Sequence, residues 1–172
     1  MNALNITGIE QLVLGVYLIA HGLIYLMFLF YFKDKDKNTH TGWSGKSLLS
    51  SVLPENINKI SGKIMWLLTS ILFAVSGIGV LDILDLKDVL IPVLILASII
   101  GIIAHLIYWV GLSPTPYHWV LGLVINIAIL FFVIFLFRNI PLLVYLLIAI
   151  WVYGMLLHTK VLSIFIHEES YS

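Results

Sequence analysis

The chain has 172 residues, of which 61% are hydrophobic and 10% are charged, and its formal net charge at pH 7 is +0. Soluble domains are about half apolar and about a quarter charged, so this composition indicates a membrane protein. Without net positive charge or a basic stripe, nucleic acid is not an expected partner. The absence of cysteine excludes disulfides, thiol catalysis and cysteine-ligated metal centres.

Several uncharged segments reach the length needed to cross a bilayer, which is about 20 residues for a helix. The predicted helices cover residues 9–32, 64–81, 89–112, 117–137 and 141–160. Together they leave no room for a separate soluble domain. We therefore predict an all-α integral membrane protein, a single membrane domain over the whole chain that folds as a compact bundle of about five transmembrane helices. Four helices and a re-entrant segment are the alternative.

The one long polar segment, residues 33–63, separates the first two predicted helices. Within it, residues 46–53 form a short amphipathic piece that ends at Pro54, and we expect this piece to lie in the plane of the membrane interface. Lysines concentrate in this segment and at Lys160, whereas the opposite loops are richer in acidic residues. Basic residues favour the cytoplasmic side. This predicts a multi-pass protein of the cell membrane, with the N-terminus outside and both residues 33–63 and the C-terminus in the cytoplasm.

Two nearly identical segments place a histidine inside predicted helices: residues 19–25 read IAHGLIY and residues 103–108 read IAHLIY. Both helices run from outside to inside, and each begins a helical hairpin. This pattern is consistent with a parallel repeat, hairpins 1–2 and 3–4, with a fifth helix added. Chance similarity between membrane segments, which use few residue types, is the alternative interpretation.

Helical spacing aligns polar residues on one face of each predicted helix. Tyr17, His21 and Tyr25 lie at positions i, i+4 and i+8 of the first helix, and Tyr108 and Asn126 occupy equivalent faces of the third and fourth. Polar and small residues in membrane helices favour the contacts between helices. We therefore expect these five residues to form an interior polar seam.

The histidines of the predicted helices carry the most specific chemical hypothesis. Neutral imidazole ligates both haem and metal ions. His105 and His158 are expected at similar depth and could bind one b-type haem, whereas His105, His118 and His158 could converge on a metal ion. The alternative is structural, because a buried histidine can simply donate a hydrogen bond to a backbone carbonyl of the bundle.

No nucleophile–base pair, acidic relay or nucleotide motif is visible in the sequence, so an enzyme is disfavoured. The leading hypothesis is a small non-enzymatic subunit or stabilising partner in a larger membrane complex. Its partners would be the lipid bilayer and other membrane proteins, or further copies of the chain. The alternatives are a haem-binding or metal-binding electron-transfer protein and a transporter of a small solute or ion along the polar seam.

Overall fold

The computed structural model describes residues 8–33, 40–113, 117–135, 148–149 and 152. The structure is mostly helical, which confirms the predicted all-α class. Its α-helices are α1 (Gly8–Met27), α2 (Glu55–Val80), α3 (Leu90–Tyr108) and α4 (Tyr117–Phe135), and the short 3-10 helix η1 (Trp109–Gly111) extends α3. By length and composition, α1, α2 and α3 with η1 are apolar enough to cross a membrane. Of the expected helix over residues 141–160, the structure describes only residues 148, 149 and 152, which are helical, and the rest lies outside the described residues.

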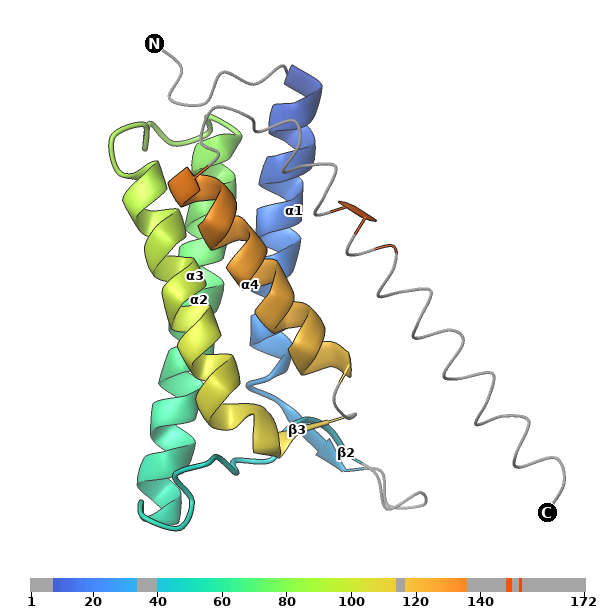
Figure 1. The fold of residues 1–172 in the computed structure, drawn as a ribbon, viewed down its shortest axis with the longest axis vertical. Coiled ribbons are helices and arrows are strands. Elements are labelled where there is room, and N and C mark those ends of the chain that lie inside the picture. Colours follow the sequence, from blue (N-terminus) through green and yellow to red (C-terminus); the bar gives the residue numbers. More distant parts are fainter. Residues whose placement is uncertain (1–7, 34–39, 114–116, 136–147, 150–151, 153–172) are drawn as a thin grey trace, which may run out of the picture.

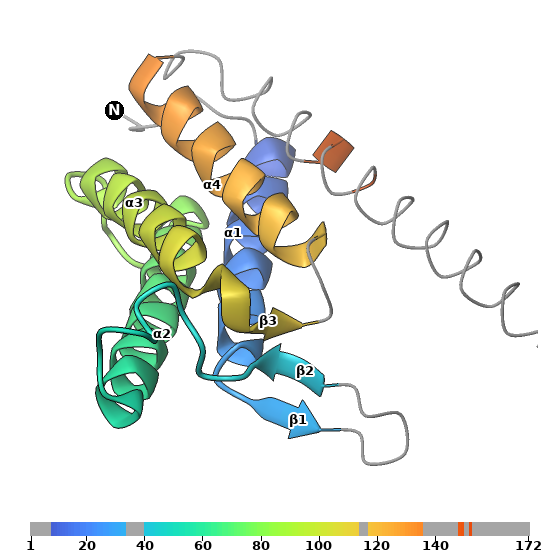
Figure 2. The ribbon, with the colours of Figure 1, turned by 60° about the horizontal axis from the view of Figure 1, so that its bottom comes forward.

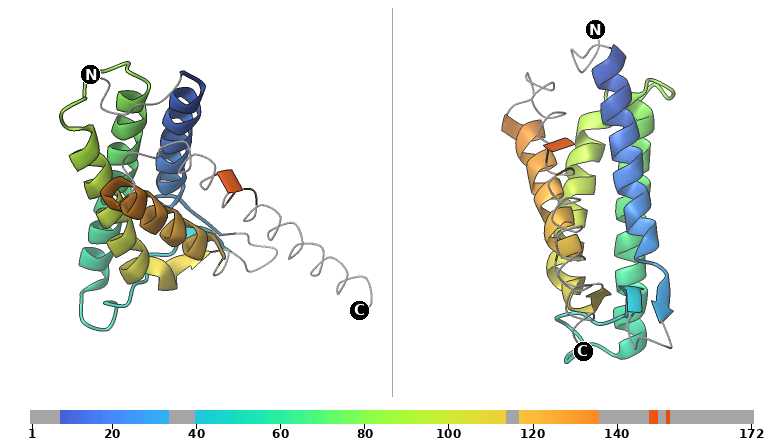
Figure 3. Two further views of the ribbon diagram at one scale, coloured as in Figure 1. Left: turned by 45° about the horizontal axis from the view of Figure 1, so that its top comes forward. Right: turned by 90° about the vertical axis from the view of Figure 1, so that its right-hand side faces the viewer.

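The four helices run alternately up and down and form a bundle (Figures 1 and 3). Helices adjacent in the chain pack against one another: α1 on α2, α2 on α3, and α3 on α4. In Figure 1, α4 crosses the other helices obliquely. Because the helix directions alternate, α1 and α3 run in the same direction and finish at the same end of the bundle.

A small antiparallel sheet, which was not expected from the sequence, covers that end (Figure 2). Its strands are β1 (Tyr31–Lys33), β2 (His40–Trp43) and β3 (Leu112–Ser113), in the order β1-β2-β3. The register pairs Tyr31 with Gly42, Gly42 with Ser113, and Trp43 with Leu112. The sheet thus joins the segment that follows α1 to the segment that follows η1.

Two helix boundaries differ from the expected ones because of local chemistry. α1 ends at Met27 instead of residue 32, since Phe30 leads into β1 and aromatic residues favour extended backbone. α2 begins at Glu55 instead of residue 64. Exposed lysines do not end a helix, and here Lys59 pairs with Glu55 one turn earlier. α2 therefore extends well beyond its uncharged part.

The amphipathic segment of residues 46–53 forms a series of turns and contains no helix. The reason is the competition of serine side chains with helical hydrogen bonds. The hydroxyl of Ser50 accepts a hydrogen bond from the backbone N–H of Ser47 at 2.8 Å, and the hydroxyl of Ser47 accepts one from the N–H of Leu49 at 3.0 Å. The segment stays compact without becoming helical.

The contact between α1 and α2 depends on glycine. A Cβ atom added to Gly22 would lie 2.8 Å from the carbonyl oxygen of Ser70, and one added to Gly77 would lie 2.6 Å from the carbonyl oxygen of Gly15. Small residues let helix backbones approach closely, which is a common way of packing helices in membranes. This contact fixes the rotation of α1 and directs one of its faces into the bundle.

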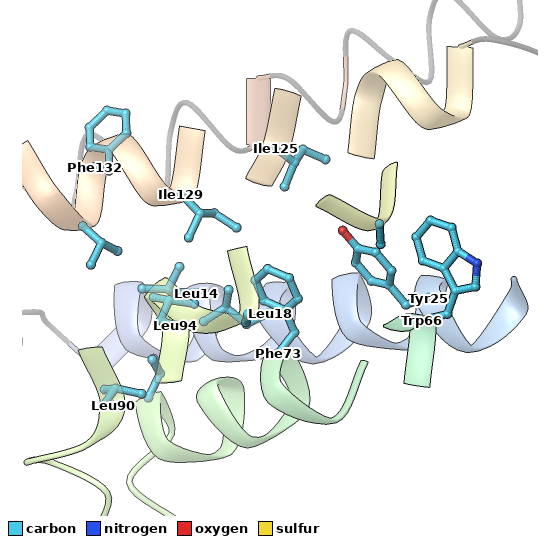
Figure 4. Packing of buried hydrophobic residues seen from close by; sticks show 14 of the residues in the cluster. Leu14, Leu18, Tyr25, Trp66, Phe73, Leu90, Leu94, Ile125, Ile129 and Phe132 are labelled. Carbon is cyan, nitrogen blue, oxygen red and sulfur yellow. The ribbon is translucent and has the colours of Figure 1, made fainter. Parts of the chain in front are cut away.

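The core runs along the whole bundle and is apolar at one end and aromatic at the other. Figure 4 shows Leu90 and Phe132 at one end and Tyr25 and Trp66 at the other. Large apolar residues also remain exposed on the outside of all four helices, for example Leu12, Ile64, Leu96 and Ile127. In the described residues, the outer surface is thus apolar, and part of the interior is polar.

Candidate functional site

The interior-facing side of α1 presents three polar aromatic residues, one turn apart. The ring of His21 stacks near that of Tyr17, with centroids 6.1 Å apart, and meets the ring of Tyr25 edge-on at 5.2 Å. His21 and Tyr25 are buried, and Tyr17 is partly buried. The i, i+4, i+8 spacing places them on one face because the helix repeats every 3.6 residues. This face is the first wall of the candidate site.

Asn126 of α4 joins this face to the fourth helix. His21 Nε2 lies 3.3 Å from Asn126 Oδ1, and Asn126 Nδ2 donates to the hydroxyl oxygen of Tyr25. Since the amide oxygen can only accept, His21 carries its proton on Nε2. Asn126 is fully buried and links two residues of α1. α1 and α4 are therefore connected by side-chain hydrogen bonds across the bundle.

The backbone of α3 makes room for this link at Gly101. A Cβ atom at Gly101 would lie 2.8 Å from Asn126 Nδ2 and 2.9 Å from the hydroxyl oxygen of Tyr25. Both distances are shorter than the contacts that a real Cβ makes, so any side chain at Gly101 would displace one of the two partners. The polar link thus needs residues from three helices.

His105 of α3 is bonded in a different way. Its Nδ1 atom lies 2.8 Å from the carbonyl oxygen of Gly101, one turn back on its own helix. Because a carbonyl only accepts, Nδ1 carries the proton, and the neutral ring presents a lone pair on Nε2. His105 is 1% exposed, and its Nε2 has no hydrogen-bond partner within the described part of the chain. This tautomer is the one that a ligand-binding histidine adopts.

The surroundings of His105 are aromatic and tight. Its ring lies edge-on to Tyr25 at 5.5 Å and to Trp66 at 5.4 Å between centroids. On the α4 side, a Cβ atom added to Gly122 would be 2.5 Å from His105 Nε2. The free lone pair therefore faces the backbone of α4. A ligand on Nε2 would need α4 to move away at Gly122.

We define the polar cluster as Tyr17, His21, Tyr25, His105 and Asn126. His21 of α1 and His105 of α3 both contact the ring of Tyr25. The cluster forms hydrogen bonds between α1 and α4, and within the described residues two of its buried polar groups, the Tyr17 hydroxyl and His105 Nε2, have no hydrogen-bond partner. Among the described residues, no three histidine or acidic side chains are grouped so that they could hold a metal ion.

The other predicted site residues lie elsewhere. Tyr108 is buried nearer the sheet, where its hydroxyl donates to Ser61 Oγ at 2.9 Å and its ring meets Trp43 at 5.2 Å. His118 lies in the first turn of α4, but its side chain lies outside what the structure describes, as does all of His158. The haem pair and the three-histidine metal site therefore stay predictions.

A second buried polar group, centred on Asn58, was not predicted from the sequence of residues 33–63. Asn58 is 1% exposed, and its amide donates to the carbonyl oxygen of Gly45 at 2.6 Å. Its Oδ1 accepts a hydrogen bond from the Ser47 hydroxyl. The spacing of Asn58, Gly62 and Trp66 at i, i+4 and i+8 could have revealed it, had α2 been extended past its lysines.

Comparison of the chain with protein families, with curated proteins and with solved structures finds no match.

Proposed function

We propose that this chain is an integral membrane protein that acts as a non-enzymatic subunit or stabilising partner in a larger membrane complex. The observation that carries the proposal is the distribution of side chains in the bundle. Leu12, Ile71, Leu96 and Ile127, one on each helix, are each about half exposed, whereas Asn126 is completely buried. Apolar outer faces around a polar interior are suited to lipid and to other membrane helices.

The bonding within the polar cluster supports a role in packing. His21, Tyr25 and Asn126 satisfy one another across α1 and α4, and Ser98 and His105 bond to carbonyl groups of their own helix. Polar groups inside a membrane bundle are costly unless they are paired. Within the described residues, only the Tyr17 hydroxyl and His105 Nε2 of the cluster lack a hydrogen-bond partner, and a cluster whose other polar groups are paired internally is typical of helix association. Partners would then bind on the outer faces, as other membrane proteins or as further copies of the chain.

The proposal includes the number of membrane spans and their orientation. We infer five membrane spans, with residues 33–63 and the C-terminus in the cytoplasm and the N-terminus outside. The lysines of this end support the orientation: Lys46, Lys59 and Lys63 are exposed near the sheet, whereas Asp82, Asp85 and Asp88 lie at the opposite end. Extraction of membranes with alkaline carbonate tests insertion. A protein released by carbonate would contradict it.

The experiment for a partner uses the absence of native cysteine. Single cysteines replace Leu12, Ile71, Leu96 and Ile127, each carries a photo-crosslinker, and the products are analysed from intact membranes. A buried control is Ser98→Cys, since Ser98 is 0% exposed. We expect one outer face to give a crosslinked product of higher mass that the control lacks. A stable protein that purifies alone and crosslinks from none of the four faces would overturn the proposal.

A haem or metal site is the second candidate function, because His105 has the ligand-competent tautomer and its Nε2 has no hydrogen-bond partner within the described residues. Such a site would need a movement of α4 at Gly122 and a second ligand, for which His158 is the predicted source. An absorption spectrum and metal analysis of the purified protein test it. A haem band that is lost in His105→Ala and kept in His21→Ala would support this function. A colourless preparation without metal would exclude it.

A further inference from the structure

At the sheet end of the bundle, residues 48–53 form an apolar projection, which we call the apolar turn. Val52 is 78% exposed and Leu48 is 55% exposed, although both are large apolar residues. These two residues lie in turns and not on a helix, so their exposure is not part of the outer face of the bundle. Large apolar side chains gathered on a surface indicate a place of interaction.

Hydrogen bonds hold the apolar turn in a defined shape. The N–H of Leu48 donates to the carbonyl oxygen of Ile107 at 2.9 Å, which attaches the turn to α3. Buried Asn58 binds Gly45 and Ser47 from the side of α2. Since its residues are already ordered, the turn loses little conformational freedom when its apolar side chains are buried.

The outer face of α2 continues the apolar surface of the turn. Ile57, Ile60 and Ile64 are each at least half exposed, and Ile71 follows further along the same face. The 26 residues of α2 span about 39 Å at 1.5 Å per residue. The hydrocarbon core of a bilayer is only about 30 Å thick. Because its first turns carry Lys59 and Lys63, we place this end of α2, and with it the apolar turn, at the level of the lipid headgroups.

Three exposed lysines surround this region. Lys46 precedes the apolar turn, and Lys59 and Lys63 lie one helical turn apart on α2. A Cβ atom added to Gly45 would lie 2.8 Å from carbons of the Lys59 side chain, so Lys59 lies beside the segment that carries Lys46. Glu55 pairs with Lys59 and offsets one positive charge. The region combines apolar side chains with positive charge at headgroup depth.

We propose that the apolar turn, with Lys46, Lys59 and Lys63, is a binding site for the headgroups of anionic phospholipids. The apolar side chains enter the boundary between headgroups and acyl chains, and the ammonium groups contact lipid phosphate. This combination of apolar insertion and basic residues is how protein segments bind at an anionic membrane surface. The inference rests on the proposed membrane insertion.

The first test measures lipid preference. The purified protein, in nanodiscs of phosphatidylcholine with or without phosphatidylglycerol, is released and analysed for retained lipid by native mass spectrometry. We expect phosphatidylglycerol to be retained preferentially. The variant with Lys46→Gln, Lys59→Gln and Lys63→Gln should lose the preference, by up to about fivefold for each lysine removed. An unchanged preference in this variant would overturn the proposal.

The matched control is Lys87→Gln at the opposite end of the bundle. Lys87 lies 3.6 Å from Asp82 and 3.5 Å from Asp85, and these carboxylates raise the pKa of its ammonium above the ordinary value. It is already neutralised by protein groups, so its removal should leave the lipid preference intact. A loss equal to that of the triple variant would mean that overall charge decides retention, and would overturn the site.

A second test separates this inference from membrane insertion itself. Spin labels are placed at Val52→Cys, at Ile71→Cys in the middle of α2, and at Ile83→Cys in the opposite turn, and their depth is measured in the same nanodiscs. We expect Ile71 in the hydrocarbon core, and Val52 at the headgroups, moving deeper when phosphatidylglycerol is added. A label at Ile83 should not move.

The outcomes differ clearly. If the Ile71 label lies in water, membrane insertion fails. If Ile71 lies in hydrocarbon but Val52 lies in bulk water, only the lipid site fails. Adding inorganic phosphate or glycerol phosphate distinguishes a lipid from a soluble anion: neither should compete with phosphatidylglycerol for retention. Competition by these soluble anions would overturn a site for lipid.

Discussion

The segments around His21 and His105 have nearly the same sequence but different roles in the bundle. His21 bonds to Asn126 on another helix, whereas His105 bonds to Gly101 on its own helix, and its Nε2 has no partner among the residues that the structure describes. α1 and α3 run in the same direction, and both histidines meet Tyr25. The two similar segments therefore bring two imidazoles to the same ring, that of Tyr25. The residues of the neighbouring helix determine which hydrogen bonds each imidazole makes.

Glycine explains much of this difference. Gly22 follows His21 directly and brings α1 against the backbone of α2, which rotates His21 toward Asn126. The second segment has no glycine at that point, and its close contact comes from Gly122 of α4, which faces the ring of His105. His21 is thus positioned by the close contact of its own helix with α2. His105 is accommodated because Gly122 on α4 has no side chain.

The largest expected effect comes from Gly22→Ala. The added methyl would lie 2.8 Å from the Ser70 carbonyl oxygen and 3.1 Å from the Ala74 nitrogen, and backbone atoms cannot move aside singly. α1 and α2 must separate, which we expect to cost about 2 kcal/mol of unfolding free energy. Unfolding in mixed micelles measures it. The control is Gly8→Ala, because no described residue has an atom within 4 Å of a Cβ added at Gly8. Equal stability of the two variants would contradict the role of Gly22.

Asn126→Leu should have the next largest effect, because it removes both hydrogen bonds to α1. Bonds between membrane helices contribute about 0.6 kcal/mol on average and up to about 1.7 kcal/mol each. We expect a loss of about 1 to 2 kcal/mol in unfolding free energy. A double-mutant cycle with His21→Leu should give a coupling energy near the value for one bond, whereas a cycle with His105→Leu should give none. A measurable coupling energy between Asn126 and His105 would contradict the assignment of His21 as the histidine that bonds to α4.

Gly122→Ala tests the contact between His105 and α4. The new methyl would be 2.5 Å from Nε2, so the buried ring or the helix must shift, at a cost of about 1 kcal/mol. In the background of His105→Ala the same substitution should cost nothing. Thermal unfolding of the single and double variants measures the difference. A cost that persists without the imidazole would show that another neighbour is responsible.

His105→Leu should have the smallest effect on stability. The bond from Nδ1 is local, and leucine replaces a ring whose buried Nε2 has no partner in the described part of the chain. Removing an unsatisfied polar group offsets the lost bond, so we expect a change within about 0.5 kcal/mol. His21→Leu, which breaks a bond between helices, should cost more. The two variants are compared in the same unfolding assay, and a greater loss for His105→Leu would indicate that Nε2 has a partner after all.

Much of the fold could be predicted from apolar runs and from turn residues. Runs of membrane length place α1, α3 and α4 within a few residues of the observed bounds. The start of α2 could not be found in the same way, because a rule based on uncharged length treats Lys59 and Lys63 as a boundary. The sheet could not be predicted either, since strands of two to four residues have too few positions for an alternating pattern.

For the candidate site, the shared face of Tyr17, His21 and Tyr25 follows from helical spacing alone. The partner of each residue does not. Whether Asn126 reaches His21 or His105 depends on the rotation and tilt of α4, which result from close contacts at Gly101 and Gly122. The partner that a glycine contacts, whether a backbone or a ring, cannot be read from the sequence.

The sheet also has a consequence for the order of assembly. β1 and β2 are neighbours in the chain and can pair as soon as residues 31–43 have been synthesised, but β3 arrives only after two further helices. Until then Trp43, which is 4% exposed in the finished protein, has neither Leu112 beside it nor Tyr108 against its ring. Pairing between distant segments is slow, because the loop must close before the contact forms. Completion of the sheet is therefore a late step of folding, and the burial of Trp43 marks the arrival of α3 in its place.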